Sequence, residues 1–179
     1  MRLLSVNVGL PKTVTLMRRA VSTAFFKEPV PGVIPLSNLG LRGDGQADPK
    51  VHGGPAKAVY LYPFEHYAHW SAVLGRTDLT PGAFGENFTT EGLLETDVRI
   101  GDVFAVGSAK LQVTKPRRPC AKLGLRMGSM NFVRVFAAGG RPGFYLSVVE
   151  EGSVGAGDAI TRITTDPSRP TVAEVFAAG

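Results

Sequence analysis

Glycine and proline divide this chain into short segments, and their frequency limits the folds that it can adopt. The 179 residues include 22 glycines and 13 prolines. These residues supply the backbone angles that tight turns need, and groups such as Gly43-Asp44-Gly45 are strong turn signals. A fold of many short strands accommodates such turns better than a bundle of long helices does. With 44% hydrophobic and 20% charged residues, the composition is that of a globular domain.

Runs of alternating, β-branched and aromatic residues predict strands. The expected strands lie in residues 3–9, 57–63 and 87–90, with two in 98–116 and two in 144–163. Residues 33–54 are expected to be mainly loop. The fold class is therefore mainly β with a few helices, and a closed or nearly closed barrel would hide the strand edges.

Three segments have helical features. Phe64, Tyr67, Trp70 and Leu74 recur at three- and four-residue spacing, so a helix is expected over 64–75, where Gly75 provides a stop. A second helix is expected from about Leu123 to Ala138, despite two internal glycines. The last nine residues, 171–179, could form one helical turn or a frayed end.

Positive charge is concentrated in one part of the chain. Residues 103–149 contain no Asp or Glu but eight Lys or Arg, whereas the rest carries 12 basic and 15 acidic residues. Such a field attracts anions, including phosphate, carboxylate and nucleic acid. The alternative is a basic surface without a specific ligand.

The single cysteine, Cys120, lies in the middle of this basic segment, in the sequence KPRRPCAKLG. One cysteine cannot form an internal disulfide, which favours a reducing compartment. No signal peptide and no apolar run long enough to span a membrane is recognisable. We therefore expect a cytoplasmic protein.

Several known cysteine chemistries fit this sequence poorly. The three histidines do not form a zinc-site spacing with Cys120. Cys120 and Arg126 match C-x5-R, the phosphate-binding loop of thiol phosphatases, but the residues around them do not support that function. A cysteine protease stays open because folding could bring a histidine to the thiol, although no local signature supports it. Motifs for nucleoside triphosphates, dinucleotides and hydrolase serines are absent.

Cations beside a thiol favour the thiolate, which is a nucleophile and a soft metal ligand. A soft ligand next to anion-binding groups suits a soft, high-valent metal on a phosphorylated cofactor. The alternative is a buried, inert cysteine. The flanking cations and prolines make burial in an apolar core the weaker interpretation.

Six segments occur in a characteristic order along the chain: GDGQAD, VHGGPAKAVYLYP, PGAFGENFTTEGL, VRIGD, KPRRPCAKLG and GRPGFYLSVVEEGSVGAGD. Together they resemble one known family, the MOSC domain, which is named after the C-terminal domain of molybdenum-cofactor sulfurases, and in particular its stand-alone, YiiM-like branch. The resemblance covers about residues 1–165, and it predicts a single MOSC domain followed by a tail over 166–179. YiiM-like chains usually continue into a small helical module, which we do not expect here.

The resemblance implies a β-barrel-like fold. It also implies a molybdenum-pterin cofactor in a basic groove, with the motif cysteine bound to the metal. It implies a reductase of N-hydroxylated compounds, such as hydroxylaminopurine-type bases or amines. Electrons would come from a separate flavin reductase. Two alternatives stay open. One is a carrier of sulfur or cofactor that uses Cys120, and the other is nucleic-acid binding, which the scarcity of aromatics around Cys120 disfavours.

The resemblance also assigns roles to individual residues. Cys120 matches the metal-binding cysteine, and Asn87 matches a cofactor-contacting position. His52 could donate a proton during N–O reduction, or it could simply brace the following turn. The remaining expected cofactor contacts are basic residues that suit phosphate or pterin, namely Arg118, Arg141, Lys57 and Lys122.

Overall fold

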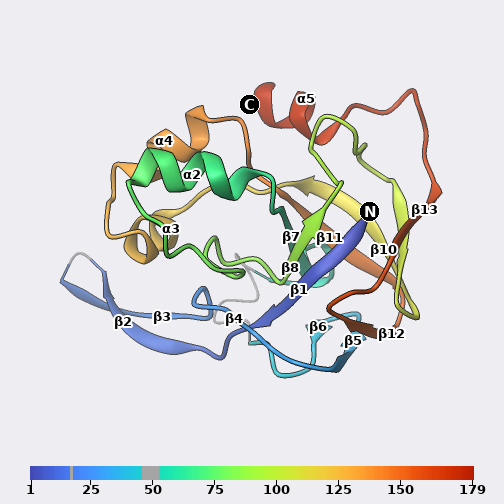
Figure 1. Ribbon diagram of the computed structural model, residues 1–179, viewed down its shortest axis with the longest axis horizontal. Helices are drawn as coiled ribbons and strands as arrows, with labels where there is room; N and C mark the ends of the chain where they lie inside the picture. The colour runs from blue at the N-terminus through green and yellow to red at the C-terminus, as the bar shows by residue number, and fades with distance from the viewer. Residues whose placement is uncertain (17, 46–52) are drawn as a thin grey trace.

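The computed structural model describes residues 1–16, 18–45 and 53–179 (Figure 1). The predicted mainly β class is confirmed. In chain order the strands are β1 (Arg2–Val8), β2 (Lys12–Leu16), β3 (Arg19–Thr23), β4 (Glu28–Pro29), β5 (Val33–Ser37), β6 (Gly40–Leu41), β7 (Val59–Pro63), β8 (Phe88–Glu91), β9 (Val103–Val106), β10 (Ala109–Pro116), β11 (Phe144–Glu150), β12 (Gly152–Gly155) and β13 (Ile160–Thr164). The helices are η1 (Pro55–Lys57), α2 (His66–Leu74), α3 (Ala121–Arg126), α4 (Phe132–Ala138) and α5 (Val172–Ala177).

Within the described residues the strands form three sheets. The largest has the order β13-β9-β10-β11-β7-β8-β1-β4, and only the β7–β8 pair in it is parallel. A smaller sheet has the order β12-β5-β6, and β2 pairs with β3 in a separate hairpin. The hairpin and the strands between residues 33 and 41 were not predicted.

The expected closed barrel is not confirmed, because the sheets of the described residues do not close. One edge strand, β4, has two residues, and its proline cannot donate a ladder hydrogen bond. An isolated antiparallel bridge between Arg2 and Ala159 does join the start of β1 to the segment before β13. The edges are thus shortened and partly bridged instead of being fully paired.

The helical predictions have mixed outcomes. Helix α2 forms as expected and ends at Gly75, which has a left-handed φ of 62°. The single helix expected over 123–138 is wrong, because α3 and α4 are separate. Gly128 lies between them with a φ of 71°, a conformation that cannot continue an α-helix.

A capped helix, α5, forms within the last nine residues. Thr171 accepts a hydrogen bond from the Glu174 N–H (3.1 Å), and Glu174 accepts one from the Thr171 N–H (2.7 Å). This reciprocal pair is a capping box, which satisfies two backbone donors at the start of the helix. Val172 is fully buried in the main core, so α5 packs onto the body of the fold.

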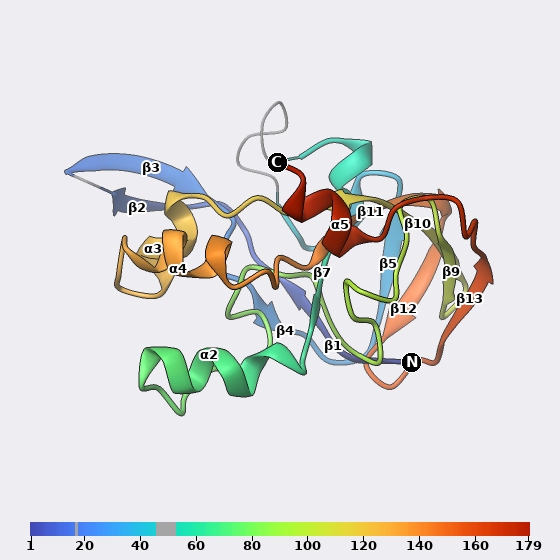
Figure 2. The same cartoon turned by 90° about the horizontal axis from the view of Figure 1, so that it is seen from above.

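Two hydrophobic clusters hold the fold together. The larger one lies among the strands, and the smaller one is mainly aromatic and lies beneath α2, α3 and α4. In the smaller cluster Phe136 stacks on Trp70, with ring centroids 5.0 Å apart, and also contacts Phe84. Figures 1 and 2 show these three helices at one end of the large sheet, with the β2–β3 hairpin beside α3.

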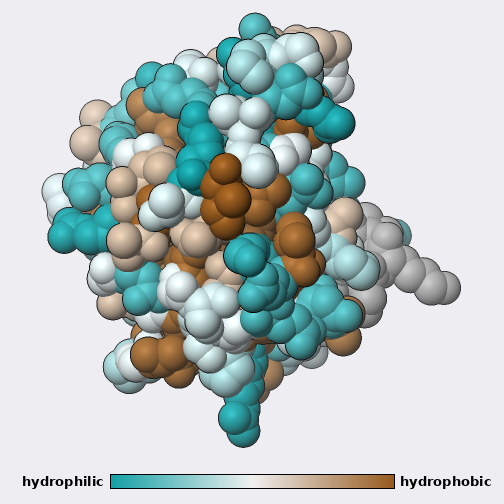
Figure 3. All heavy atoms as spheres, turned by 90° about the vertical axis from the view of Figure 1, so that its right-hand side faces the viewer, coloured by the Kyte–Doolittle hydropathy of each residue, from teal (hydrophilic) through white to brown (hydrophobic). Residues whose placement is uncertain are grey.

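The surface shown in Figure 3 has several apolar patches interrupted by hydrophilic side chains. Exposed large hydrophobic residues occur at separate places in the chain, such as Leu10, Val33 and Val149. Among the described residues, no helix has the length and apolar character needed to cross a bilayer.

The aromatic cluster generates a stability prediction. Phe136→Ala should lower the free energy of unfolding by about 3–5 kcal/mol, because it leaves a cavity against Trp70 and Phe84. Val73→Ala is a suitable control, since Val73 lies on α2 with 47% of its surface exposed, and it should cost about 0.5 kcal/mol or less. Urea unfolding followed by circular dichroism measures both. Equal losses for the two variants would contradict the proposed packing.

Candidate functional site

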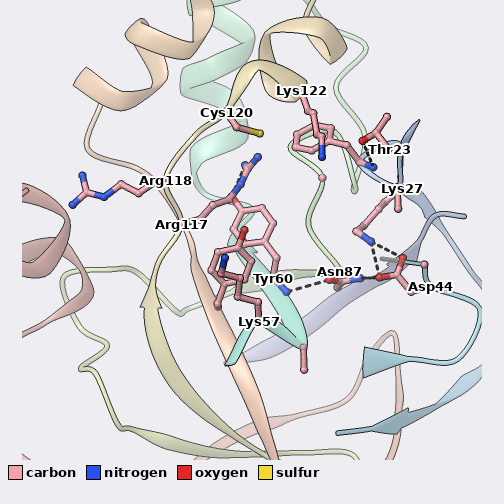
Figure 4. Close-up of a pocket in the computed structure, with 16 residues that line it drawn as sticks. Thr23, Lys27, Asp44, Lys57, Tyr60, Asn87, Arg117, Arg118, Cys120 and Lys122 are labelled. Atoms are coloured by element: carbon pink, nitrogen blue, oxygen red, sulfur yellow. Dashed lines mark hydrogen bonds and ion pairs between the residues drawn. The ribbon is translucent and has the colours of Figure 1, made fainter. Parts of the chain in front are cut away.

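A pocket lies between the base of the β2–β3 hairpin and the start of α3 (Figure 4). Its empty space is about 700 Å³, part of it open to solvent. Residues from four chain segments line it, within 23–27, 44–45, 57–60 and 117–122, together with Gly85, Asn87 and Tyr145. Both the acid-poor segment and several family motifs therefore meet at one cavity.

Cys120 is placed by the transition from strand to helix. Strand β10 ends at Pro116, and Cys120 is the extended N-cap residue of α3, where its carbonyl accepts a hydrogen bond from the Leu123 N–H (2.9 Å). Its thiol is free and half-buried, and Figure 4 shows the sulfur directed into the pocket. In the described part of the chain, no cluster of three His, Cys, Asp or Glu side chains could hold a metal by itself.

Arg117 is the main buried cation of the pocket. It is 3% exposed, and one of its terminal nitrogens donates to the Phe84 carbonyl (3.0 Å) and the Tyr60 hydroxyl (3.3 Å). Its guanidinium carbon lies 4.7 Å from the Tyr60 ring centroid and 5.0 Å from that of Phe25. No carboxylate among the described residues forms an ion pair with it. Because buried charges are normally paired, this guanidinium favours an anion in the pocket.

Two tyrosines complete this side of the pocket. Burial raises the pKa of Tyr60 above its usual value, although Arg117 acts in the opposite direction. Burial also raises the pKa of Tyr145, again opposed by Arg117. Both phenols therefore stay protonated at neutral pH, and the Tyr60 hydroxyl donates to the Pro142 carbonyl (2.8 Å).

Arg118 and Arg141 are placed differently from Arg117. Arg118 is among the lining residues, but its guanidinium stacks on Phe176 of α5 at 4.7 Å, and Figure 4 shows it directed away from Cys120. Arg141 does not line the pocket, and its side chain donates to the Gly139 carbonyl (2.8 Å). The GRPGF segment instead braces the site through its backbone, because the Gly143 carbonyl accepts from the Arg117 N–H (3.2 Å).

Asn87 forms part of a polar network on the opposite wall. Its amide nitrogen donates to Asp44 (2.9 Å) and to the Asn7 carbonyl (3.2 Å), and its amide oxygen accepts from the Tyr60 N–H (3.1 Å). Asp44 forms an ion pair with Lys27 at 2.5 Å, and both side chains are about nine-tenths buried. Burial lowers the pKa of Lys27, which Asp44 opposes. Asn87 and Asp44 thus fix the position of the wall.

The neighbouring Glu86 performs a similar structural task below the pocket. It is fully buried and accepts hydrogen bonds from the N–H groups of Gly82 (2.8 Å) and Phe84 (3.0 Å), and also from the Tyr67 hydroxyl. Burial raises its pKa. Gly85 has a φ of 80°, and a β-carbon there would come within 3 Å of the Phe25 ring. The motif around Gly85 therefore allows Phe25 to pack directly against the backbone.

Most of the predicted site residues come together. Cys120, Asn87, Arg118, Lys57 and Lys122 line the same pocket, whereas Arg141 does not. His52 lies outside the described residues. The expected cofactor contacts did not include Lys27, Asp44, Tyr60, Arg117 and Tyr145, which also line the pocket. Arg117 and Asp44 belong to motifs already noted, but the sequence around Lys27 contains no comparable signal.

Comparison with known proteins identifies related chains. The family described as "MOSC domain" matches residues 48–161. The uncharacterized protein YflK of Bacillus subtilis is 44% identical over 86% of this chain and 69% of its own length. Protein YiiM of Escherichia coli is 40% identical over 87% of this chain and 70% of its own length. A protein named "Reductase" from Gibberella moniliformis is 33% identical, but the match covers only 26% of it.

Solved structures give a consistent result. YiiM from Geobacillus stearothermophilus superposes with a TM-score of 0.81 at 32% identity, covering 98% of this chain and 81% of that protein. YiiM from Escherichia coli superposes with a TM-score of 0.73 at 30% identity, and the match covers 99% of this chain and 76% of that protein.

The buried ion pair generates a prediction about the pocket wall. Asp44→Ala should destabilise the protein by about 3–5 kcal/mol, because it leaves Lys27 buried without its partner. The double variant Lys27→Met/Asp44→Leu should be more stable than Asp44→Ala, since it removes both charges and keeps apolar volume. Urea unfolding of the three proteins checks this order. A double variant less stable than Asp44→Ala would show that the charge pair is not the source of the effect.

Proposed function

Since this chain belongs to the MOSC family, we propose that its pocket binds a molybdenum-pterin cofactor and that the loaded protein reduces N-hydroxylated compounds. The observation that carries the proposal is that one cavity contains both a free thiol and a buried guanidinium with no ion-pair partner among the described residues. The reductase name of one relative supports the reaction class. The suggested substrates are hydroxylaminopurine-type bases or hydroxylated amines.

The residues of the pocket fit such a cofactor chemically. A cysteine sulfur is a good metal ligand, so Cys120 is the proposed ligand of the molybdenum. The anionic parts of the cofactor would be bound by cations that line the cavity, with Arg117 central and Lys57 and Lys122 beside it. Arg118 is a weaker candidate, because its guanidinium is stacked on α5. Asn87 would hold the shape of the wall, since its amide is already hydrogen-bonded within the protein.

When bound, the cofactor supplies a metal that can transfer two electrons to the substrate. The overall reaction is R–NHOH + 2 H⁺ + 2 e⁻ → R–NH₂ + H₂O, in which the N–O bond breaks and the oxygen leaves as water. The pocket contributes cations that lower the energy of negative charge on the departing oxygen. Tyr145 offers a protonated phenol on the same wall, whereas the Tyr60 hydroxyl donates to the Pro142 carbonyl. His52 stays the proposed proton donor, and a flavin reductase the proposed electron source.

Loss of the thiol tests the function directly. Protein purified from a host that makes the cofactor should contain nearly stoichiometric molybdenum, and Cys120→Ala should contain almost none. Reduction of 6-hydroxylaminopurine by reduced viologen dye should fall to background in the variant. Equal turnover by both proteins would contradict the proposal. Sulfane sulfur on Cys120 without molybdenum would instead indicate a sulfur carrier, whereas a loaded but inactive wild type would indicate a cofactor carrier.

A matched pair of arginine variants separates the two neighbours of the cysteine. Arg117→Met should weaken cofactor retention by about ten- to a hundred-fold, because a charge-assisted hydrogen bond contributes about 1.5–3 kcal/mol. Arg118→Met should cause a smaller loss. Molybdenum content after dialysis measures retention, and circular dichroism checks folding. Arg117→Lys keeps the charge and should lie between the wild type and Arg117→Met. A greater loss from Arg118→Met would reverse the assignment.

A further inference from the structure

A second part of the chain is free of acidic residues. Residues 1–27 contain no Asp or Glu, and they carry five basic residues. The fold places the β2–β3 hairpin of this segment beside α3, which belongs to the acid-free segment 103–149 (Figures 1 and 2). Phe26 connects the two, because Lys12 lies 4.1 Å and Arg126 4.9 Å from its ring centroid. Two separate basic segments thus form one surface.

Five basic residues on this surface have no ion-pair partner among the described residues. We define the basic face as Lys12, Arg18, Arg19, Lys122 and Arg126, which come from the hairpin and α3. None of the five forms an ion pair with a carboxylate of the described residues. Some basic residues elsewhere do form ion pairs, and those on the exposed surface include Arg2, Arg76, Lys110 and Arg169. The basic face therefore produces a net positive field.

The pocket lies at the junction of the elements that form the basic face. Thr23 at the end of β3 lines the pocket, and so do Cys120 and Lys122 at the start of α3. Met130 follows α3 and is 38% exposed, which adds an apolar contact close to the cations. A molecule bound across the hairpin and α3 would therefore be adjacent to the pocket that holds Cys120.

The proposed reaction consumes two electrons in each turnover, and they have to be delivered at this pocket. We propose that the basic face is the docking surface for an acidic redox protein that supplies them, an inference that rests on the proposed function. Complementary charge accelerates the encounter of such partners and orients them, even where the interface is small.

A nucleic acid is the weaker interpretation of the same charge. Single-stranded nucleic acids usually bind by stacking bases on exposed aromatic rings. The aromatic rings near the basic face, Phe25 and Phe26, already contact the side chains of Arg117, Lys12 and Arg126. An acidic protein needs no such rings, because carboxylates pair directly with lysine and arginine.

Charge reversal on the hairpin tests the inference. The probe is an acidic flavodoxin, used in reduced form as electron donor to molybdenum-loaded protein. Arg18→Glu/Arg19→Glu should raise the KM for flavodoxin by about ten-fold or more, since the attraction is replaced by repulsion. Activity with reduced viologen dye should stay within about two-fold of wild type, because a small dye needs no docking surface.

The control variant is Arg2→Glu/Arg169→Glu. It changes the net charge by the same amount at two exposed residues whose side chains are each 58% accessible. The N-terminus lies far from the hairpin in both Figures 1 and 2. This variant should keep the wild-type KM for flavodoxin.

Binding of oxidised flavodoxin to each protein, measured by biolayer interferometry at several salt concentrations, gives a readout that does not depend on turnover. Weaker binding by the hairpin variant alone supports the docking surface. Unchanged binding, or equal loss in the control variant, overturns it. Salt-dependent binding of single-stranded DNA without binding of flavodoxin also overturns it, in favour of a nucleic-acid surface. Inactivity with the dye would refute the proposed reaction, while flavodoxin binding would still decide the docking surface.

Discussion

The buried guanidinium of Arg117 is the interaction on which the pocket depends. It joins Phe25 after the hairpin, Tyr60 on β7 and the Phe84 carbonyl before β8, so three distant segments converge on one side chain. Burying a cation is costly unless its donors and its charge are satisfied. Two neutral oxygens accept hydrogen bonds from one terminal nitrogen of Arg117, and two rings pack against the guanidinium. Its positive charge can therefore act on the cavity beside Cys120.

The opposite wall has a different design. Lys27 and Asp44 are buried as a pair, and their charges largely cancel within the protein. Asn87 and the Gly9 N–H both donate to Asp44, which fixes the loop after β6 against β1 and β8. The positive charge of Arg117 can therefore interact with a ligand, whereas the Lys27–Asp44 pair stabilises the structure of the opposite wall. A cavity of this kind can bind an anion without rearranging first.

Sequence reasoning predicted the parts of this fold that are determined locally. Strands such as β7 and β10 follow from alternation, and Gly75 marks the end of α2. It did not predict the hairpin, whose strands β2 and β3 are mostly exposed. It expected one helix where Gly128 separates two. The charge and family motifs indicated the basic cysteine site, but not which arginine faces it. Arg117 and Arg118 follow β10 directly, and only the three-dimensional packing decides which is buried.

Gly85 has a geometric consequence for this pocket. Its missing side chain lets the Phe25 ring lie against the backbone, and Arg117 lies over that ring and over Tyr60. Flat groups packed at contact distance act as a spacer of fixed thickness, because van der Waals contacts resist compression. A methyl group at position 85 would come within 3 Å of the Phe25 ring, so the stack would have to shift. The shape of this wall thus depends on a residue that has no side chain.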